Sequence, residues 1–73
     1  MVQKHMSEHV KNEVYRLRTG HSITQEQLAD AVGVSRQTII AIEKGNYTPS
    51  VLLALKVARY FKEPVDTIFI LKP

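Results

Sequence analysis

Residues 25–44 constrain the fold of this chain more than any other segment, because two helical stretches here are separated by only Gly33-Val34-Ser35. Helices joined by so short a turn must cross steeply, which requires a small residue where the two backbones approach. Ala29 is small enough, and Gly33 tolerates the positive φ that the turn needs. The apolar residues expected to fill the angle between the helices are Leu28, Val32, Val34, Ile39 and Ile42. The segment therefore predicts a helix-turn-helix at about residues 25–44.

Capping residues and helix breakers divide the rest of the chain into further helices. Thr24 and Gln27 have the spacing of a capping box, and Ser7, Ser35 and Ser50 are expected N-caps. The expected terminators are Gly20, Gly33, Gly45 and Pro64. The predicted helices cover about 8–19, 25–32, 36–44 and 51 to shortly before Pro64, and residues 64–69 can form one more turn or a short helix.

Apolar spacing gives the first and fourth predicted helices one buried stripe each. The first stripe is Val10, Val14 and Leu17, and the fourth is Val51, Ala54, Leu55, Ala58 and Phe61. No stretch alternates polar and apolar residues over enough length to predict a strand. We therefore expect an all-α domain of four to five helices at residues 8–73, preceded by a flexible N-terminal arm at residues 1–7. The arm also has the form of a cloning remnant, in which case residues 1–5 are not native and Met6 is the start.

Composition limits the chemistry that the 73 residues can support. Ten Lys and Arg residues against seven Asp and Glu residues give a net charge of +3, which permits a nucleic-acid partner without establishing one. The absence of cysteine excludes disulfides, thiolate zinc sites and thiol catalysis. No apolar run approaches the ~20 residues that span a bilayer, and no signal peptide is evident, so we expect a cytoplasmic, nucleoid-associated protein without membrane contact.

The motifs along the chain resemble the lambda-repressor/Cro-like (XRE-type) family of helix-turn-helix DNA-binding domains. The resemblance covers about Val10 to Phe69 and implies a compact lambda-repressor-like fold. One departure is Ser22, which stands where the family often has glycine. The matching motifs are Leu17-Arg18, Thr24-Gln25-Glu26-Gln27-Leu28-Ala29, Gly33-Val34-Ser35-Arg36-Gln37-Thr38-Ile39, Ile42-Glu43-Lys44-Gly45 and Pro49-Ser50.

The third predicted helix carries residues suited to contact base pairs. With Ile39 and Ile42 directed into the core, its opposite face is a stripe of Arg36, Gln37, Ile40, Ala41 and Lys44. Arginine can bridge guanine O6 and N7, and glutamine can bridge adenine N6 and N7. Ile40 and Ala41 can contact thymine methyl groups, and an α-helix fits the major groove of B-DNA. We expect base contacts from Arg36, Gln37, Ile40 and Ala41.

A second set of residues is expected to contact the DNA backbone. The resemblance implies that Gln25, at the start of the second helix, binds a phosphate. The further candidates for phosphate contacts are Thr38, Lys44, Asn46 and Tyr47. For residues 46–48 the alternative is an ordinary loop after the glycine that ends the third helix.

Two further groups of residues have structural interpretations. The resemblance implies that Arg18 and Glu43 form an ion pair between the first and third helices. Leu52, Ile70 and Leu71 are candidates for a dimer contact, because exposed apolar patches usually mark interfaces. Ile68 and Phe69 are expected instead to close the core of a short fifth helix.

The resemblance implies a sequence-specific double-stranded DNA-binding transcriptional regulator, a repressor acting as a homodimer on a near-palindromic operator. We expect no enzyme activity, no cofactor and no metal, and we interpret the match of His5-Met6-Ser7-Glu8-His9 to a zinc-peptidase motif as chance. The alternative is an antitoxin or adaptor whose main partner is a protein held by the apolar C-terminal end.

Overall fold

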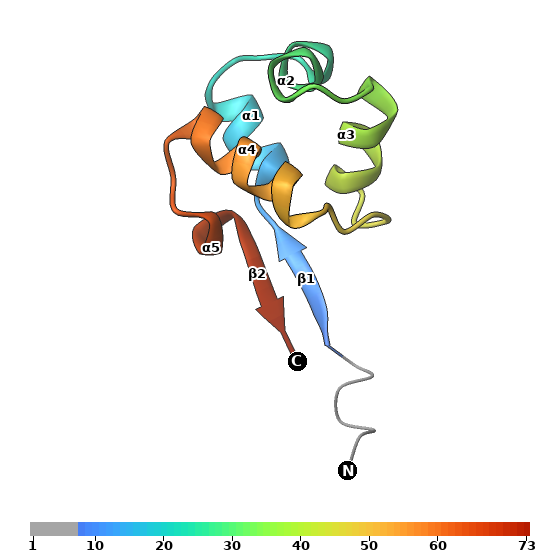
Figure 1. Cartoon of the computed structure of the whole chain (residues 1–73), viewed down its shortest axis with the longest axis vertical. Helices are drawn as coiled ribbons and strands as arrows, with labels where there is room; N and C mark the ends of the chain where they lie inside the picture. The colour runs from blue at the N-terminus through green and yellow to red at the C-terminus, as the bar shows by residue number, and fades with distance from the viewer. Residues whose placement is uncertain (1–7) are drawn as a thin grey trace.

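The computed structural model describes residues 8–73, over which the chain forms five helices and two short strands (Figure 1). The elements follow in the order β1 (His9–Asn12), α1 (Val14–Gly20), α2 (Gln25–Val32), α3 (Arg36–Glu43), α4 (Val51–Phe61), α5 (Val65–Ile68) and β2 (Phe69–Lys72). The fold is therefore mostly helical, as the sequence predicts.

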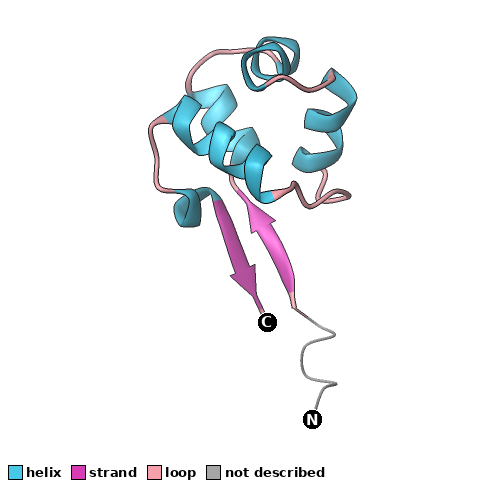
Figure 2. Ribbon diagram, in the orientation of Figure 1, coloured by secondary structure: helices cyan, strands magenta, loops and turns pink. Residues whose placement is uncertain are grey.

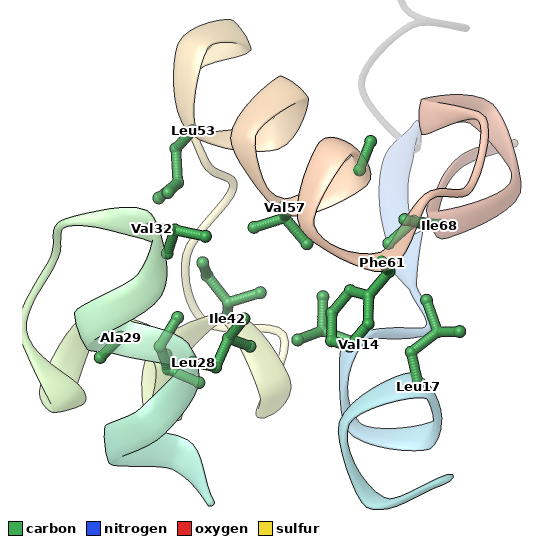
Figure 3. Packing of buried hydrophobic residues seen from close by; sticks show 12 residues of the cluster. Val14, Leu17, Leu28, Ala29, Val32, Ile42, Leu53, Val57, Phe61 and Ile68 are labelled. Atoms are coloured by element: carbon green, nitrogen blue, oxygen red, sulfur yellow. The ribbon is translucent and has the colours of Figure 1, made fainter. Parts of the chain in front are cut away.

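One hydrophobic core joins the five helices (Figure 3). Apolar side chains turn inward from each helix and leave little or none of their surface exposed. Removing such side chains from water is the main favourable contribution to folding, at roughly 25 cal/mol per Å² of apolar surface. The buried residues are Val14, Leu17, Leu28, Ala29, Val32, Ile39, Ile42, Leu53, Val57, Ala58, Phe61 and Ile68.

The predicted helix caps around the helix-turn-helix are confirmed. Thr24 Oγ1 accepts a hydrogen bond from the Gln27 backbone N–H, and the Thr24 N–H donates to Gln27 Oε1. Ser35 and Ser50 likewise accept from backbone N–H groups three residues onward. Gly33 has a φ of 78°, so the turn between α2 and α3 uses the left-handed conformation that glycine adopts without strain.

The predicted start of the first helix at residue 8 is wrong. Residues His9–Asn12 form strand β1, and α1 begins only at Val14. Asn12 Oδ1 accepts a hydrogen bond from the Val14 N–H, in the manner of a residue that caps a helix. Val10 is therefore half-buried in a strand and is not part of a helical core stripe. The predicted cap at Ser7 and the predicted arm at residues 1–7 lie outside the described residues.

The prediction that the chain contains no strand is also wrong. β1 pairs antiparallel with β2, in a register that places His9 opposite Lys72 and Asn12 opposite Phe69. The two-stranded ribbon that β1 and β2 form extends away from the helices and carries the C-terminal end of the chain (Figure 2). Its base is attached to the core, because Ile68 is fully buried and its carbonyl accepts from the Glu13 N–H at 2.9 Å. Each strand has only four residues, which is too short for a clear alternation of polar and apolar residues in the sequence.

The predicted inward face of α4 is correct only in part. Ala58 and Phe61 are buried as expected, but Val51 and Leu55 are exposed. Leu53 and Val57, which the prediction left out, occupy the core in their place. The helix is apolar on most of its surface, so spacing alone does not determine which side turns inward.

Two non-glycine residues adopt the left-handed conformation at chain reversals. Ser22 has a φ of 57° in the loop between α1 and α2, at the position where the family that the chain resembles often has glycine. Lys62 has a φ of 58° and ends α4 two residues before Pro64, so the helix stops at a C-cap and not at the proline. A residue with a Cβ is strained in this conformation, because the Cβ lies too close to the following carbonyl oxygen, and the strain lowers the free energy of unfolding.

We predict that Lys62→Gly stabilises the protein by about 0.5–1 kcal/mol, because glycine relieves the strain of the left-handed C-cap. Chemical denaturation measures the change in the free energy of unfolding. Lys62→Ala is the matched control, since it removes the same charge but keeps the Cβ. Equal stability of the glycine and alanine variants would contradict the argument from backbone strain.

Candidate nucleic-acid interface

The stripe predicted on the third helix faces outward from α3. Arg36, Gln37 and Lys44 are exposed, and Ile40 and Ala41 are half-buried. The opposite side of α3 is anchored in the core by Ile39 and Ile42, which are fully buried. The helix lies at the edge of the helical bundle (Figure 1), which leaves its outer surface accessible to a large partner.

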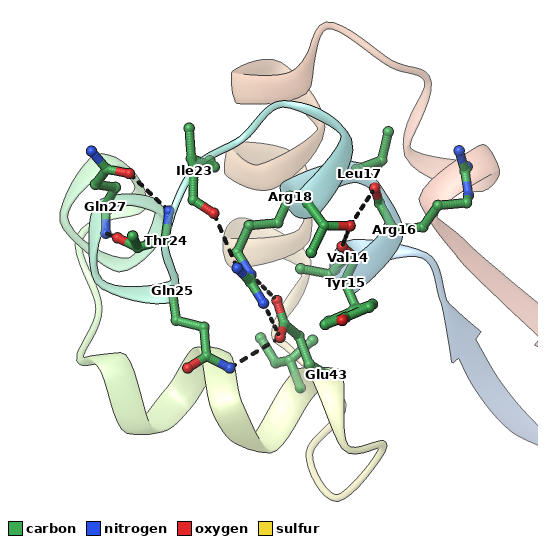
Figure 4. A network of polar contacts seen from close by, with 12 residues as sticks. Val14, Tyr15, Arg16, Leu17, Arg18, Ile23, Thr24, Gln25, Gln27 and Glu43 are labelled. Atoms are coloured by element: carbon green, nitrogen blue, oxygen red, sulfur yellow. Dashed lines mark hydrogen bonds and ion pairs between the residues drawn. The ribbon is translucent and has the colours of Figure 1, made fainter.

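The predicted ion pair between Arg18 and Glu43 is present and connects α1 to α3 (Figure 4). Arg18 Nε donates to Glu43 Oε2 at 2.6 Å, and Arg18 Nη2 donates to Glu43 Oε1 at 3.0 Å. The two side chains are only 11% and 6% exposed. The hydrogen bonds that Arg18 donates to Glu43 raise the pKa of Arg18 above its ordinary value, so the guanidinium remains charged.

The same guanidinium also secures the loop before α2. Arg18 Nη1 donates to the Ile23 carbonyl at 3.0 Å, just after Ser22 reverses the chain. The Tyr15 ring lies against the other side of Arg18, with its centroid 5.4 Å from the guanidinium carbon. Arg18 thereby positions the start of α2 relative to α3.

Gln25, the first residue of α2, is half-buried and directed toward α3. Its Nε2 donates to Glu43 Oε1 at 3.1 Å, an interaction that the sequence does not indicate. Gln25 and Arg36 line the same open hollow of about 550 Å³. The structure therefore brings a predicted phosphate contact and a predicted base contact to one surface.

The other predicted phosphate contacts lie at the two ends of α3. Thr38 is half-buried near the start of the helix, where its hydroxyl lies 3.2 Å from the Ser35 hydroxyl. Lys44, Asn46 and Tyr47 are exposed beyond its C-terminal end. The loop containing them is held by the Asn46 N–H, which donates to the Ala41 carbonyl.

Asn12 is a positioning residue that sequence reasoning missed. Its Nδ2 donates to the Ile42 carbonyl at 2.9 Å, while its Oδ1 accepts from the first N–H of α1. The side chain thus connects the start of α1 to the last turn of α3. An asparagine just before an apolar stripe is a recognisable N-terminal signal, but the predicted earlier start of the first helix obscured it.

The predicted apolar patch is divided between two elements. Leu52 on α4 is 64% exposed and Leu71 on β2 is 66% exposed, while Ile70 is half-buried. Ile68 is buried and Phe69 packs against the core, as predicted for these two residues. Val51 and Leu55 add exposed apolar surface to α4 that the prediction assigned to the core.

Within residues 8–73, no three His, Asp or Glu side chains are grouped so that they could hold a metal ion. In the same part of the chain, no helix is long and apolar enough to span a membrane. Three residues of the zinc-peptidase-like motif, His5, Met6 and Ser7, lie outside the described residues.

Comparisons with known proteins agree with this geometry. Residues 14–68 match a family described as Helix-turn-helix. An HTH-type transcriptional regulator from Methanocaldococcus jannaschii is 54% identical over 61 residues, which cover 84% of this chain and 92% of that protein. The HTH-type transcriptional regulator YgzD from Bacillus subtilis is 48% identical over 60 residues, covering 82% of this chain and 91% of YgzD. The structure of the restriction-modification controller protein C.AhdI from Aeromonas hydrophila is similar with a TM-score of 0.68 and 28% identity, covering 73% of this chain and 80% of C.AhdI.

We predict that Glu43→Ala lowers the free energy of unfolding by about 3–5 kcal/mol, because it leaves the largely buried Arg18 charge without its partner. Thermal and urea denaturation measure the loss. Asp30→Ala, which removes an exposed acidic residue of α2, is the control and changes stability little. Unchanged melting of Glu43→Ala would contradict a structural role for the pair.

Proposed function

This chain belongs to the helix-turn-helix family of DNA-binding transcriptional regulators, and we propose that it binds double-stranded DNA sequence-specifically with α3 in the major groove. The family comprises regulators and not enzymes. The observation that supports the proposal is the outward stripe on α3, which is exposed along one side and anchored by buried isoleucines on the other. A helix held in this way can enter a groove without disturbing the core.

We infer base contacts from the N-terminal half of α3. Arg36 and Gln37 are exposed at its first two positions, where side chains of a recognition helix approach base edges. Ile40 and Ala41, one turn later, present apolar groups suited to thymine methyls. The expected bidentate partners are guanine for Arg36 and adenine for Gln37.

We infer that phosphate contacts on both sides of this stripe set the position of α3 on the duplex. Gln25 approaches from α2, and Thr38 lies on α3 itself. Lys44, Asn46 and Tyr47 extend the contact beyond the C-terminal end of α3. Such contacts carry no sequence information directly and make affinity depend strongly on salt.

We infer that the protein acts as a homodimer. α4 is apolar toward the core and again toward solvent, where Val51, Leu52 and Leu55 are exposed. A helix with two apolar sides is stable in water when a second surface covers the outer side. With Ile70 and Leu71 of the ribbon, these residues form the proposed self-association surface.

A dimer of this kind would recognise a near-palindromic operator with half-sites about one helical turn apart, ~34–36 Å. We infer a repressor, because a regulator bound to promoter DNA through α3 occupies the sequence that polymerase would otherwise bind. Repression by excluding polymerase from the promoter does not require a surface that contacts polymerase.

We predict that Arg36→Ala and Gln37→Ala each weaken operator binding by about 1–3 kcal/mol and relax preference at one base pair. Selection of bound fragments from a random duplex pool measures the preference. Lys44→Ala is the matched comparison, since loss of a phosphate contact weakens binding to all sequences alike. Equal losses on cognate and random DNA for all three variants would contradict direct contacts to bases.

We predict that Leu52→Glu and Leu71→Glu each weaken self-association at least about tenfold, because a carboxylate would be buried without a partner. Sedimentation velocity measures the oligomeric state, and Ala31→Glu, on an exposed position of α2, is the control. A monomeric native protein that co-purifies in fixed ratio with another polypeptide would favour the antitoxin or adaptor alternative.

A further inference from the structure

Glu43 accepts hydrogen bonds from two other helices through one carboxylate (Figure 4). Arg18 of α1 donates to both of its oxygens, at 2.6 and 3.0 Å. Gln25 of α2 donates its Nε2 to Oε1 at 3.1 Å. The third bond is not needed for the ion pair, because Arg18 already occupies both carboxylate oxygens.

The bond from Gln25 determines which end of its amide faces Glu43. A carboxylate accepts only, so the NH₂ end must be the end that approaches it. The two N–H groups of Nε2 point in different directions, and Glu43 takes one of them. Among residues 8–73, the second N–H of Gln25 has no acceptor in the structure. It is therefore available to a ligand outside the protein.

Arg18 allows the Glu43 carboxylate to act as a hydrogen-bond acceptor close to the proposed DNA surface. An unpaired Glu43 beside the proposed DNA surface would repel phosphate, but the guanidinium compensates its charge at hydrogen-bond distance. Glu43 can then act as a strong acceptor for Gln25 without leaving a net negative charge toward DNA. Both members of the pair are nearly buried, so the acceptor is held rigidly.

We propose that Glu43 is a positioning residue for DNA binding, which holds the Gln25 amide so that its second N–H donates to a backbone phosphate. The proposal rests on the proposed function, in which Gln25 contacts DNA. Its physical basis is preorganisation: a glutamine side chain loses rotamer freedom when it binds, and here part of that freedom is already lost in the free protein.

A double-mutant cycle with Gln25→Ala and Glu43→Asp tests this coupling. Aspartate keeps the charge opposite Arg18 but withdraws the carboxylate from Gln25 by one methylene. Gln25→Ala should weaken binding to an operator duplex about tenfold in the native background, as expected for a hydrogen bond to a charged group. In the Glu43→Asp background, Gln25→Ala should weaken binding to the same duplex by less than about twofold. Thr38→Ala, which removes a proposed phosphate contact near the opposite end of α3 from Glu43, should weaken binding by the same factor in both backgrounds.

A purely structural role of Glu43 predicts a different result. Glu43→Asp would then lower the melting temperature, but the effect of Gln25→Ala would remain tenfold, and that result overturns the proposal. The chemical shifts of the Gln25 side-chain amide protons are a second readout in the native protein and in Glu43→Asp. They should move to the values of an exposed glutamine in the variant, and unchanged shifts also overturn the proposal.

Glu43→Leu provides a second variant, because leucine has neither the charge nor an oxygen that can accept from Gln25, and its binding is measured at a temperature at which the variant is folded. Loss of a negative charge beside DNA by itself strengthens binding, whereas loss of the acceptor for Gln25 weakens it. The proposal requires weaker binding, and tighter binding overturns it. Failure of the native protein to bind any duplex would overturn the proposed function together with this inference, whereas independent, additive losses would overturn this inference alone.

Discussion

The arrangement of α1, α2 and α3 depends on the Arg18–Glu43 ion pair. Its two side chains are nearly buried, and the guanidinium also binds the Ile23 carbonyl of the loop that leads into α2. Apolar packing brings the three helices together but does not by itself determine their relative orientation, because such contacts are not directional. The bidentate geometry of arginine and carboxylate is directional, so it orients the helices that form the proposed DNA surface.

The two sides of α3 illustrate how stability and function are separated along one short helix. Ile39 and Ile42 are fully buried in the core, and α3 packs chiefly against α2 and also contacts α1. Arg36, Gln37 and Lys44 are exposed and contribute little to the core. Substitutions on the outer side can therefore change the exposed surface of α3 without changing the fold.

Local sequence signals predicted the helix-turn-helix because every determinant lies close in the chain. The Thr24–Gln27 capping box, the Ser35 cap and the left-handed Gly33 each act within a few residues, and all three are present in the structure. The ribbon could not be predicted in this way, because β1 forms only by pairing with β2 at the other end of the chain. The inward side of α4 was ambiguous for a related reason: apolar residues surround the helix, and contacts with distant helices select Leu53 and Val57 over Val51 and Leu55.

The sequence by itself determined the helical segments from α2 to α4, their caps and the outward stripe on α3, since backbone propensity and apolar periodicity are local properties. Only the tertiary structure decided that residues 9–12 are a strand, that Asn12 binds the end of α3, and that Gln25 shares the carboxylate of Glu43 with Arg18. These interactions join residues that are far apart in the chain. Their geometry exists only after the core has formed, because packing of the apolar side chains brings the polar groups within hydrogen-bond distance.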